Sequence, residues 1–415
     1  MTLPALRSIE GAFAQAYGIP PAAVVRAPGR VNLIGEHTDY SDLPVLPIAI
    51  EQSLFVAAVA TEDATVEAAS AQFGRAALMQ RQGANAAASW QRYVVGALSQ
   101  LVDVAPARGA KLFVSGDLPS AGGLSSSSAL TMGVIAALLA AWEQPFDPED
   151  VARRATVAER HVGVESGGMD QAVIAHGRAG NALRIDFRPP ARTLVPLPQG
   201  LMLVVAYSGE EAPKGGTARD AYNERVVGAR IAAAMIADQV GVDLDLPLTL
   251  GQVSGVDVVD IIVDGLPEKV SAQEVAHGTE VDLQHLVQLT AANFDHMAKV
   301  PVKRIARHIL SEAQRVSEAQ DALISGDLYR FGKLLDESHN SLREDFRCST
   351  PALDRVCAAM RRAGAFGSRL TGAGFGGYAL AACERAQGAA VIAAATGATG
   401  GPAFEVRAAD GMALL

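Results

Sequence analysis

The alternation of apolar and polar positions predicts that the chain begins with a helix and continues into strands. Residues 5–17 place apolar side chains at helical spacing, and the sequence GIPP at 18–21 then ends the helix because proline cannot continue it. From residue 24 to about residue 67, short runs rich in valine and isoleucine alternate with turn residues, as in strands. The first part of the chain is therefore expected to form a sheet.

Helical and extended patterns alternate through the rest of the chain. We expect helices at 90–102, 129–142, 147–161, 220–240, 281–294, 302–325, 328–342 and 351–363, and strands at 110–115, 182–187, 201–206 and 404–407. A strand–loop–strand unit is expected at 368–382. The proline-rich connection at 189–200 suggests a boundary between one domain of residues 1–195 and another of residues 196–415.

Composition limits the classes of protein to which this chain can belong. A chain of 415 residues is long for a single core, so two domains that share a cleft are expected. A formal net charge of −10 argues against a nucleic-acid partner. The apolar segment 129–142 is shorter than the roughly 20 residues of a membrane helix, so we expect a buried core helix and no membrane partner. Three scattered cysteines and the lack of a signal-like start favour a cytoplasmic location.

The first chemistry-bearing motif is RAPGRVNLIGEHTDY at 26–40. It combines strand-forming residues with the ionisable side chains of Arg30, Glu36, His37 and Asp39. Each hydroxyl of a sugar needs a fixed donor or acceptor, and a dense set of polar side chains can supply them. The motif therefore predicts a site for a polyhydroxylated small molecule.

The second motif, GDLPSAGGLSSSSAL at 116–130, places glycines and serines directly before an apolar helix. Glycines allow close approach of the backbone, and the amides and dipole at a helix N-terminus attract anions. The pattern favours a phosphate site, although it lacks the Gly-Lys-Ser/Thr of a Walker A loop. The alternative is a flexible turn whose serines only cap the helix.

Two further motifs also contain glycines. In ESGGMDQ at 165–171, Asp170 lies among apolar neighbours and is a candidate general base if a cation tunes it, the alternative being an acid that caps a helix start. LTGAGFGGYAL at 370–380 has four glycines between strand-like flanks. It predicts either a tight hairpin or a loop that lies against a ligand.

Together, and in this order, the four motifs resemble those of the galactokinases, within the GHMP family of small-molecule kinases. The similar segments are RVNLIGEHTDY at 30–40, GLSSS at 123–127, GMDQ at 168–171, AYNER at 221–225, SHNSLREDF at 338–346 and TGAGFGG at 371–377. The resemblance covers most of the chain. It implies an α/β (α+β) two-domain GHMP kinase fold, with an N-terminal ribosomal-protein-S5-like mixed sheet, a C-terminal ferredoxin-like α/β sandwich and the active site between them.

The resemblance also implies roles for individual residues. Asp170 is expected to take the proton of the anomeric hydroxyl, while Arg30 pairs with it, lowers its pKa and stabilises the transferring phosphoryl group. The sugar is expected to contact Arg30, Glu36, His37, Asp39, Gly167, Asp170 and Tyr222. ATP is expected to lie against Gly122, Gly123, Leu124, Ser125, Ser126, Ser127 and Ser128, with Mg²⁺ held by Ser127 and Glu159.

The activity implied by the resemblance is that of an ATP-dependent sugar 1-kinase acting on D-galactose. Alternatives within this chemistry are another aldose, an N-acetylhexosamine or a uronic acid, the last disfavoured because Glu36 and Asp39 would repel it. A non-catalytic sensor of sugar and ATP is the alternative from another class, but the serines, Arg30 and Asp170 are all present. The protein is expected to act as a monomer or homodimer.

The chain departs from the family pattern at three places. SDLP at 41–44 puts a proline where the family has a glycine, which leaves the sugar preference open. Glu159 lies one residue closer to Asp170 than is usual, a rotation of about 100° on a helix, so it either reaches the metal or is a solvated helix residue. The segment 207–219 differs from the family, and residues 241–295 resemble an insertion without an assigned function.

Overall fold

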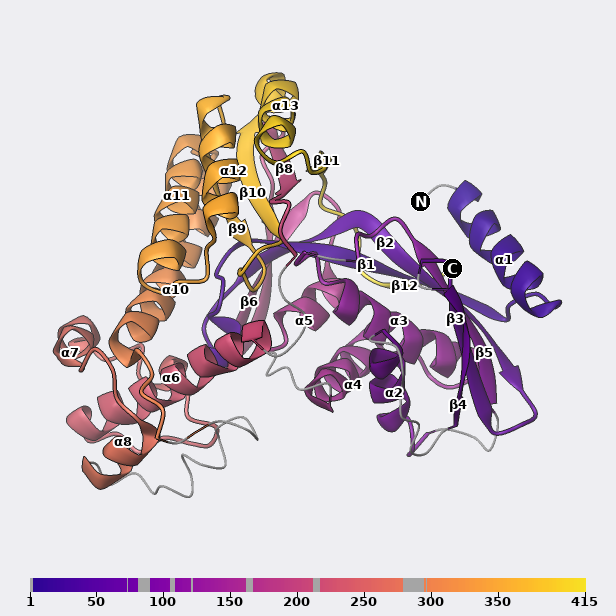
Figure 1. Cartoon of the computed structure of the whole chain (residues 1–415), viewed down its shortest axis with the longest axis horizontal. Coiled ribbons are helices and arrows are strands. Elements are labelled where there is room, and N and C mark those ends of the chain that lie inside the picture. The colour runs from indigo at the N-terminus through magenta and orange to yellow at the C-terminus, as the bar shows by residue number, and fades with distance from the viewer. Residues whose placement is uncertain are drawn as a thin grey trace.

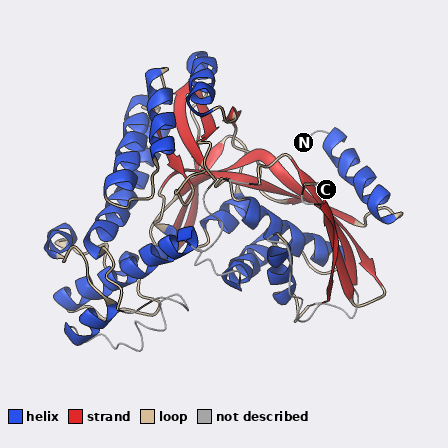
Figure 2. Ribbon diagram, viewed as in Figure 1, coloured by secondary structure: helices blue, strands red, loops and turns tan. Residues whose placement is uncertain are grey.

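The structure is a computed structural model that describes residues 3–415 except 73, 81–89, 105–108, 121, 162–166, 212–216, 279–294 and 296. Two helix-covered sheets and a separate hairpin form its framework (Figures 1 and 2). In the part of the chain that is described, no helix combines the length and the apolar character that a membrane span needs.

The first sheet has the strand order β12-β1-β2-β5-β3-β4. Its strands are β1 (Ala23–Ile34), β2 (Leu46–Thr61), β3 (Thr65–Ser70), β4 (Gly74–Gln80), β5 (Gly109–Gly116) and β12 (Ala413–Leu414). β3 and β5 pair in parallel and the other neighbours are antiparallel, so the sheet is mixed. The register of β1 on β2, with Arg30 opposite Ala49, fixes the position of the first motif.

Helices cover both faces of this sheet because its strands alternate apolar side chains between the faces. On one face, Val25 and Val56 belong to a core that also includes α3 (Ser126–Ala141), α2 (Gln91–Ser99) and α4 (Pro148–His161). α5 (Met169–His176) also packs on α3. Val24 and Ala57 face α1 (Leu3–Tyr17), which lies on the other side (Figure 1). α3 is apolar all round because the sheet and helices enclose it.

The second sheet is antiparallel, in the order β11-β8-β10-β9. Its strands are β8 (Leu201–Tyr207), β9 (Gly367–Thr371), β10 (Tyr378–Glu384) and β11 (Ala403–Val406). The long helices of this part are α6 (Thr217–Val240), α10 (Val302–Ser325), α11 (Leu328–Glu344), α12 (Pro351–Arg362) and α13 (Gly388–Thr399). Shorter elements are η1 (Asp39–Ser41), η2 (Leu250–Gln252), α7 (Val259–Gly265), α8 (Ala272–Gly278) and η3 (Arg385–Gln387).

The predicted mixed α/β architecture is confirmed, but several elements were missed, β7 and α13 among them. The connection at 189–200 contains a strand, β7 (Pro190–Pro196), which forms a hairpin with β6 (Asn181–Phe187). Most side chains of β7 are exposed, so no buried face produced an alternating pattern. α13 was missed because its alanines and glycines give no contrast between two faces.

The C-terminal end of the chain returns to the first sheet. β12 returns to pair with β1, and the amide of Ala409 donates to the carbonyl of Ala49 at 2.9 Å. The division into residues 1–195 and 196–415 stays a prediction. The helix predicted at 281–294 lies outside the described residues.

Candidate active site

A forked ion pair between Arg30 on β1 and Asp170 on α5 lies at the centre of the site. Nε of Arg30 donates to Oδ1 of Asp170 at 2.7 Å, and Nη2 donates to Oδ2 at 3.0 Å. Burial opposes the charge of Arg30, but the nearby carboxylates of Asp170 and Glu36 outweigh it, and the pKa of Arg30 is raised. The third nitrogen, Nη1, donates to the carbonyl of Gly123. One guanidinium thus joins the third motif to the glycine–serine loop.

Hydroxyls of the serine loop also contact Asp170. Ser125 donates to its Oδ2, and Ser128 lies 3.4 Å from the same oxygen. Ser125 immediately precedes α3 and has a positive φ of 58°. The helix N-terminus, the guanidinium and the carboxylate therefore meet in one place, which is an arrangement suited to an anion beside a base.

The two glycine-rich loops pack against each other. The amide of Tyr378 donates to the carbonyl of Gly122 at 2.9 Å. A Cβ on Gly122 would lie 2.8 Å from the Tyr378 ring, and one on Gly372 would lie 3.0 Å from the carbonyl oxygen of Gly123. The glycines are therefore required for this close approach, and the fourth motif is a loop between β9 and β10 that lies against the second.

Asp39 lies next to the N-terminal end of α5, which carries Asp170. The amide of Met169 donates to Oδ2 of Asp39 at 3.4 Å, and a Cβ on Gly167 would lie 2.5 Å from Cγ of Asp39. Burial, and then the negative charge of Asp170, raise the pKa of Asp39 to about 6. Asp39 and Gly167, predicted to share the sugar, are therefore neighbours.

Glu36 and His37 are buried beneath the fourth motif. Glu36 is 2% exposed, and its Oε1 accepts hydrogen bonds from the amide of Gly372 at 2.8 Å and the hydroxyl of Thr371 at 3.3 Å. Burial raises the pKa of Glu36, against the opposing effect of Arg369. Nε2 of His37 lies 3.2 Å from the carbonyl oxygen of Ala373. Both predicted sugar ligands thus already have protein partners.

An aromatic cluster surrounds His37. Its ring stacks on Phe346 with centroids 4.2 Å apart, and the ring of Tyr222 on α6 lies 5.6 Å away. Burial, and then His308, lower the pKa of His37 to about 3, so the ring is neutral. The structure therefore brings Tyr222 to the same end of the site as His37 and Tyr40.

Glu159 on α4 is buried, so the alternative of a solvated helix residue is wrong. It is 6% exposed, and its Oε1 has no hydrogen-bond partner among the described residues. Burial, and then Asp170, raise the pKa of Glu159 to about 8.

The groups that lie around Tyr93 indicate whether a magnesium ion fits this part of the site. Burial and the charge of Glu159 raise the pKa of Tyr93, while a hydrogen bond with Ser127 lowers it, so both predicted metal ligands border this phenol. A buried carboxylate oxygen without a partner beside a hydroxyl suits a hard cation that takes oxygen ligands. Within the described ranges, no cluster of three or more His, Cys, Asp or Glu side chains could hold a metal.

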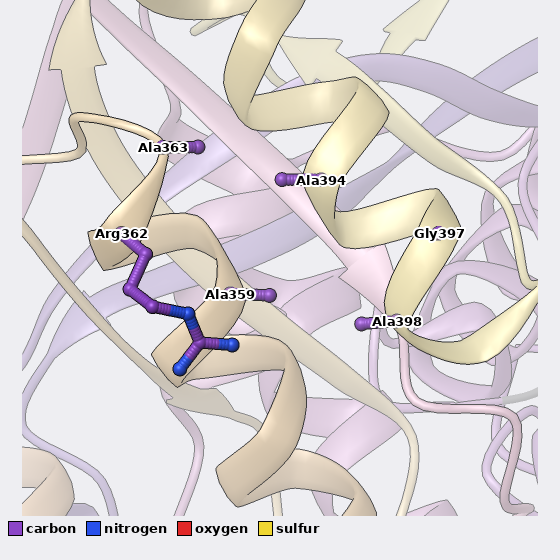
Figure 3. A pocket seen from close by; sticks show the side chains of 6 residues that line it. All are labelled: Ala359, Arg362, Ala363, Ala394, Gly397 and Ala398. Carbon is purple, nitrogen blue, oxygen red and sulfur yellow. The ribbon is translucent and has the colours of Figure 1, made fainter.

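A groove between α12 and α13 lies elsewhere in the molecule (Figure 3). Its lining residues are Ala359, Arg362, Ala363, Ala394, Gly397 and Ala398. It contains no acid, hydroxyl or imidazole that could act on a substrate. The region around Arg30 and Asp170 is therefore the candidate active site.

Several residues of the site gave no signal in the sequence. Glu312 on α10 and Arg369 on β9 are fully buried beside Glu36, and Tyr93 on α2 borders Glu159. Each is a single polar residue within an ordinary helix or strand pattern. A single polar side chain of this kind cannot be distinguished from a surface residue until its neighbours are known.

The comparisons with known proteins agree with this geometry. Residues 11–60 match the galactokinase galactose-binding signature, residues 92–178 the GHMP kinases N terminal domain, and residues 319–400 the GHMP kinases C terminal domain. The galactokinase of Chloroflexus aggregans is 34% identical over 391 residues, covering 91% of this chain and 88% of the relative. That of Dictyostelium discoideum is 31% identical over 416 residues, covering 89% and 82%.

Solved structures show the same relationship. The crystal structure of Lactococcus lactis galactokinase complexed with galactose has a TM-score of 0.79 and 27% identity, covering 99% of this chain and 100% of that one. Methanococcus jannaschii mevalonate kinase, with a TM-score of 0.59, 18% identity and coverage of 93% and 98%, shares the fold. The resemblance seen in the motifs is confirmed, and this chain belongs to the galactokinase family of GHMP kinases.

Proposed function

We propose that this protein transfers the γ-phosphoryl group of ATP to the anomeric hydroxyl of D-galactose, producing α-D-galactose 1-phosphate and ADP. The observation that carries the proposal is the forked Arg30–Asp170 pair at the N-terminal end of α3. It combines a base, a cation and an anion site in one place. The relationship to galactokinases supports the choice of sugar.

Asp170 is the proposed base. Its carboxylate accepts the proton of the anomeric hydroxyl as the oxygen attacks the γ-phosphorus. Arg30 keeps this carboxylate in place through two nitrogens and presents positive charge to the transferring phosphoryl group. Phosphoryl transfer depends mainly on such positioning and charge neutralisation.

The loop of residues 122–128 is the proposed ATP site. Positive φ values at Gly122, Gly123 and Ser125 turn the backbone before α3, whose N-terminal amides can receive phosphate oxygens. Ser127 and Glu159 are the proposed Mg²⁺ ligands. When bound, Mg²⁺ would neutralise charge on the phosphates.

The proposed sugar contacts are the backbone of Gly167 and the side chains of Asp39, His37, Glu36 and Tyr222. Asp39 is proposed to accept a hydrogen bond from a sugar hydroxyl. The bond that its Oδ2 accepts from the amide of Met169 is long, at 3.4 Å, so this oxygen can accept another donor. The neutral ring of His37 can offer one nitrogen. Arg30 and Asp170 complete the set at the anomeric end.

A coupled assay of ADP release with Mg-ATP tests the proposal. The panel contains galactose, 2-deoxygalactose, galactosamine, glucose, arabinose, N-acetylgalactosamine and galacturonate. We expect turnover with galactose, and a ³¹P spectrum of the product should show a sugar 1-phosphate. Binding of sugar and ATP without any turnover would contradict the proposal and favour the non-catalytic sensor.

The same chemistry on another sugar is the second candidate, favoured by the turn that follows Asp39. Asp42 has a positive φ of 58°, and its Oδ2 accepts from the hydroxyl of Thr249 at 2.9 Å. The segment of residues 241–295 therefore begins against the altered turn. Activity on only one other member of the panel would establish this candidate.

A further inference from the structure

The backbone that leads into the proposed sugar site receives its support from a distant helix. The amides of Gly35 and Glu36 donate to Oε1 of Glu312 on α10, at 3.0 and 3.3 Å. Glu312 is fully buried, and the hydroxyl of Ser338 on α11 donates to the same oxygen at 2.6 Å. A side chain from the other half of the chain thus determines where these two amides point.

This support acts on a backbone of unusual conformation. Gly35 has a φ of 102°, and His37 has a φ of 66°, which is rare for a residue with a side chain. Such conformations cost free energy and persist where the surroundings impose them. Between these residues, the carbonyl of Glu36 lies 3.1 Å from Nε2 of His308, also on α10. α10 therefore contacts both the donors and the acceptor of the turn.

The charges around Glu312 are balanced within the protein. Nε of Arg315 donates to Oε2 of Glu312 at 2.8 Å. Arg369 lies 3.4 Å from Glu36 and 3.9 Å from Glu312. Two carboxylates thus face two guanidiniums, and the pKa of Glu312 is lowered, because Arg315 and Arg369 outweigh the effect of burial. Glu312 is therefore ionised and a strong acceptor for the two amides.

We propose that Glu312 is a positioning residue for the acceptor sugar, acting through the backbone of residues 35–37. By fixing the amides of Gly35 and Glu36, it orients His37 and the following Asp39 toward the sugar. The proposal rests on the proposed function of the same site. It assigns to α10 a part in sugar affinity, although Glu312 itself has no contact with the reacting atoms.

Replacing Glu312 with glutamine tests this role with little change of volume. The amide group has one acceptor oxygen and one NH₂ group, so in either orientation a donor faces other donors: the amides of the turn or Arg315. We expect the KM for galactose to rise about tenfold to a hundredfold, the range for loss of a hydrogen bond to a charged group. The KM for ATP should stay within about twofold of the parent value.

Glu318→Gln is the matched control, since Glu318 is also on α10 and pairs with an arginine, Arg330, but is 36% exposed in its side chain. It should leave both KM values unchanged. Ser338→Ala provides a milder change should Glu312→Gln fail to fold, because it removes one hydroxyl and no charge. It should raise the KM for galactose about threefold.

The outcome separates positioning from a merely structural role. A structural role would lower the fraction of folded enzyme, and therefore kcat, with KM for galactose unchanged, and that result would overturn the proposal. If the parent enzyme does not act on galactose, the proposed function fails, and amide hydrogen exchange decides the inference. Exchange at Gly35 and Glu36 should be at least tenfold faster in Glu312→Gln than in Glu318→Gln, and equal rates would refute it.

Discussion

Replacing Asp170 with asparagine is the most direct test of the proposed chemistry. The substitution preserves the shape of the side chain but removes the proton acceptor and one of the two acceptors for Arg30, which now lie 2.7 and 3.0 Å from its nitrogens. Loss of a general base typically lowers the rate by about 10²–10⁴-fold. That corresponds to about 3–5 kcal/mol in the activation barrier.

The same change has a calculable effect on stability. Removing one partner of a fully buried ion pair costs about 3–5 kcal/mol. The side chain of Asp170 is 22% exposed, and Glu36 and Asp39 also attract Arg30, so the cost here should be smaller, about 1–3 kcal/mol. We therefore expect a folded variant with a lowered midpoint of thermal unfolding.

Asp186→Asn supplies the matched control. Asp186 also forms a forked pair, with Arg184, and its side chain is 25% exposed. The assay compares ADP release, galactose binding by calorimetry and thermal unfolding for both variants. Both should lose stability, but only Asp170→Asn should lose turnover while still binding galactose. Turnover of Asp170→Asn within about tenfold of the parent would refute the assignment of the base.

Three further predictions concern the sugar and metal ligands. Asp39 has a pKa of about 6, so its carboxylate is ionised above that pH and protonated below it; the KM for galactose should rise as the pH falls from 7.5 to 5.5, and a flat profile would contradict this. Glu159→Gln should raise the Mg²⁺ concentration needed for half-maximal rate about tenfold, whereas an unchanged titration would exclude Glu159 as a ligand. Gly167→Ala places a Cβ 2.5 Å from Cγ of Asp39 and should raise the KM for galactose at least about tenfold, while Gly200→Ala, where nothing lies within 4 Å, should leave it unchanged.

Local patterns of the sequence were sufficient for most of the long helices and for the four motifs. The span predicted at 302–325 is α10, and the strand–loop–strand unit predicted at 368–382 is β9 and β10. These succeeded because a helix or strand with one buried face repeats its apolar residues at a fixed period. β7 and α13 lacked that contrast, the first because its side chains are exposed and the second because they are small.

The sequence by itself also supplied the residues of the candidate active site. The residues of each motif are contiguous, and the pairing of a guanidinium with Asp170 could be expected from the resemblance. The tertiary structure decided which groups act on one another. Glu36 contacts Gly372, and Gly35 contacts Glu312, across more than 270 residues of chain.

Only the tertiary structure could reveal the burial of Glu159 and of Glu312. Whether a single carboxylate on a helix faces water or the interior depends on what packs against that helix, and the pattern of its own residues does not contain this information. A buried carboxylate is tolerated only where cations or donors compensate for lost hydration. For Glu312, Arg315 lies one turn away on the same helix, but Ser338, Arg369 and the amides of Gly35 and Glu36 come from other parts of the chain and meet it only in the folded protein.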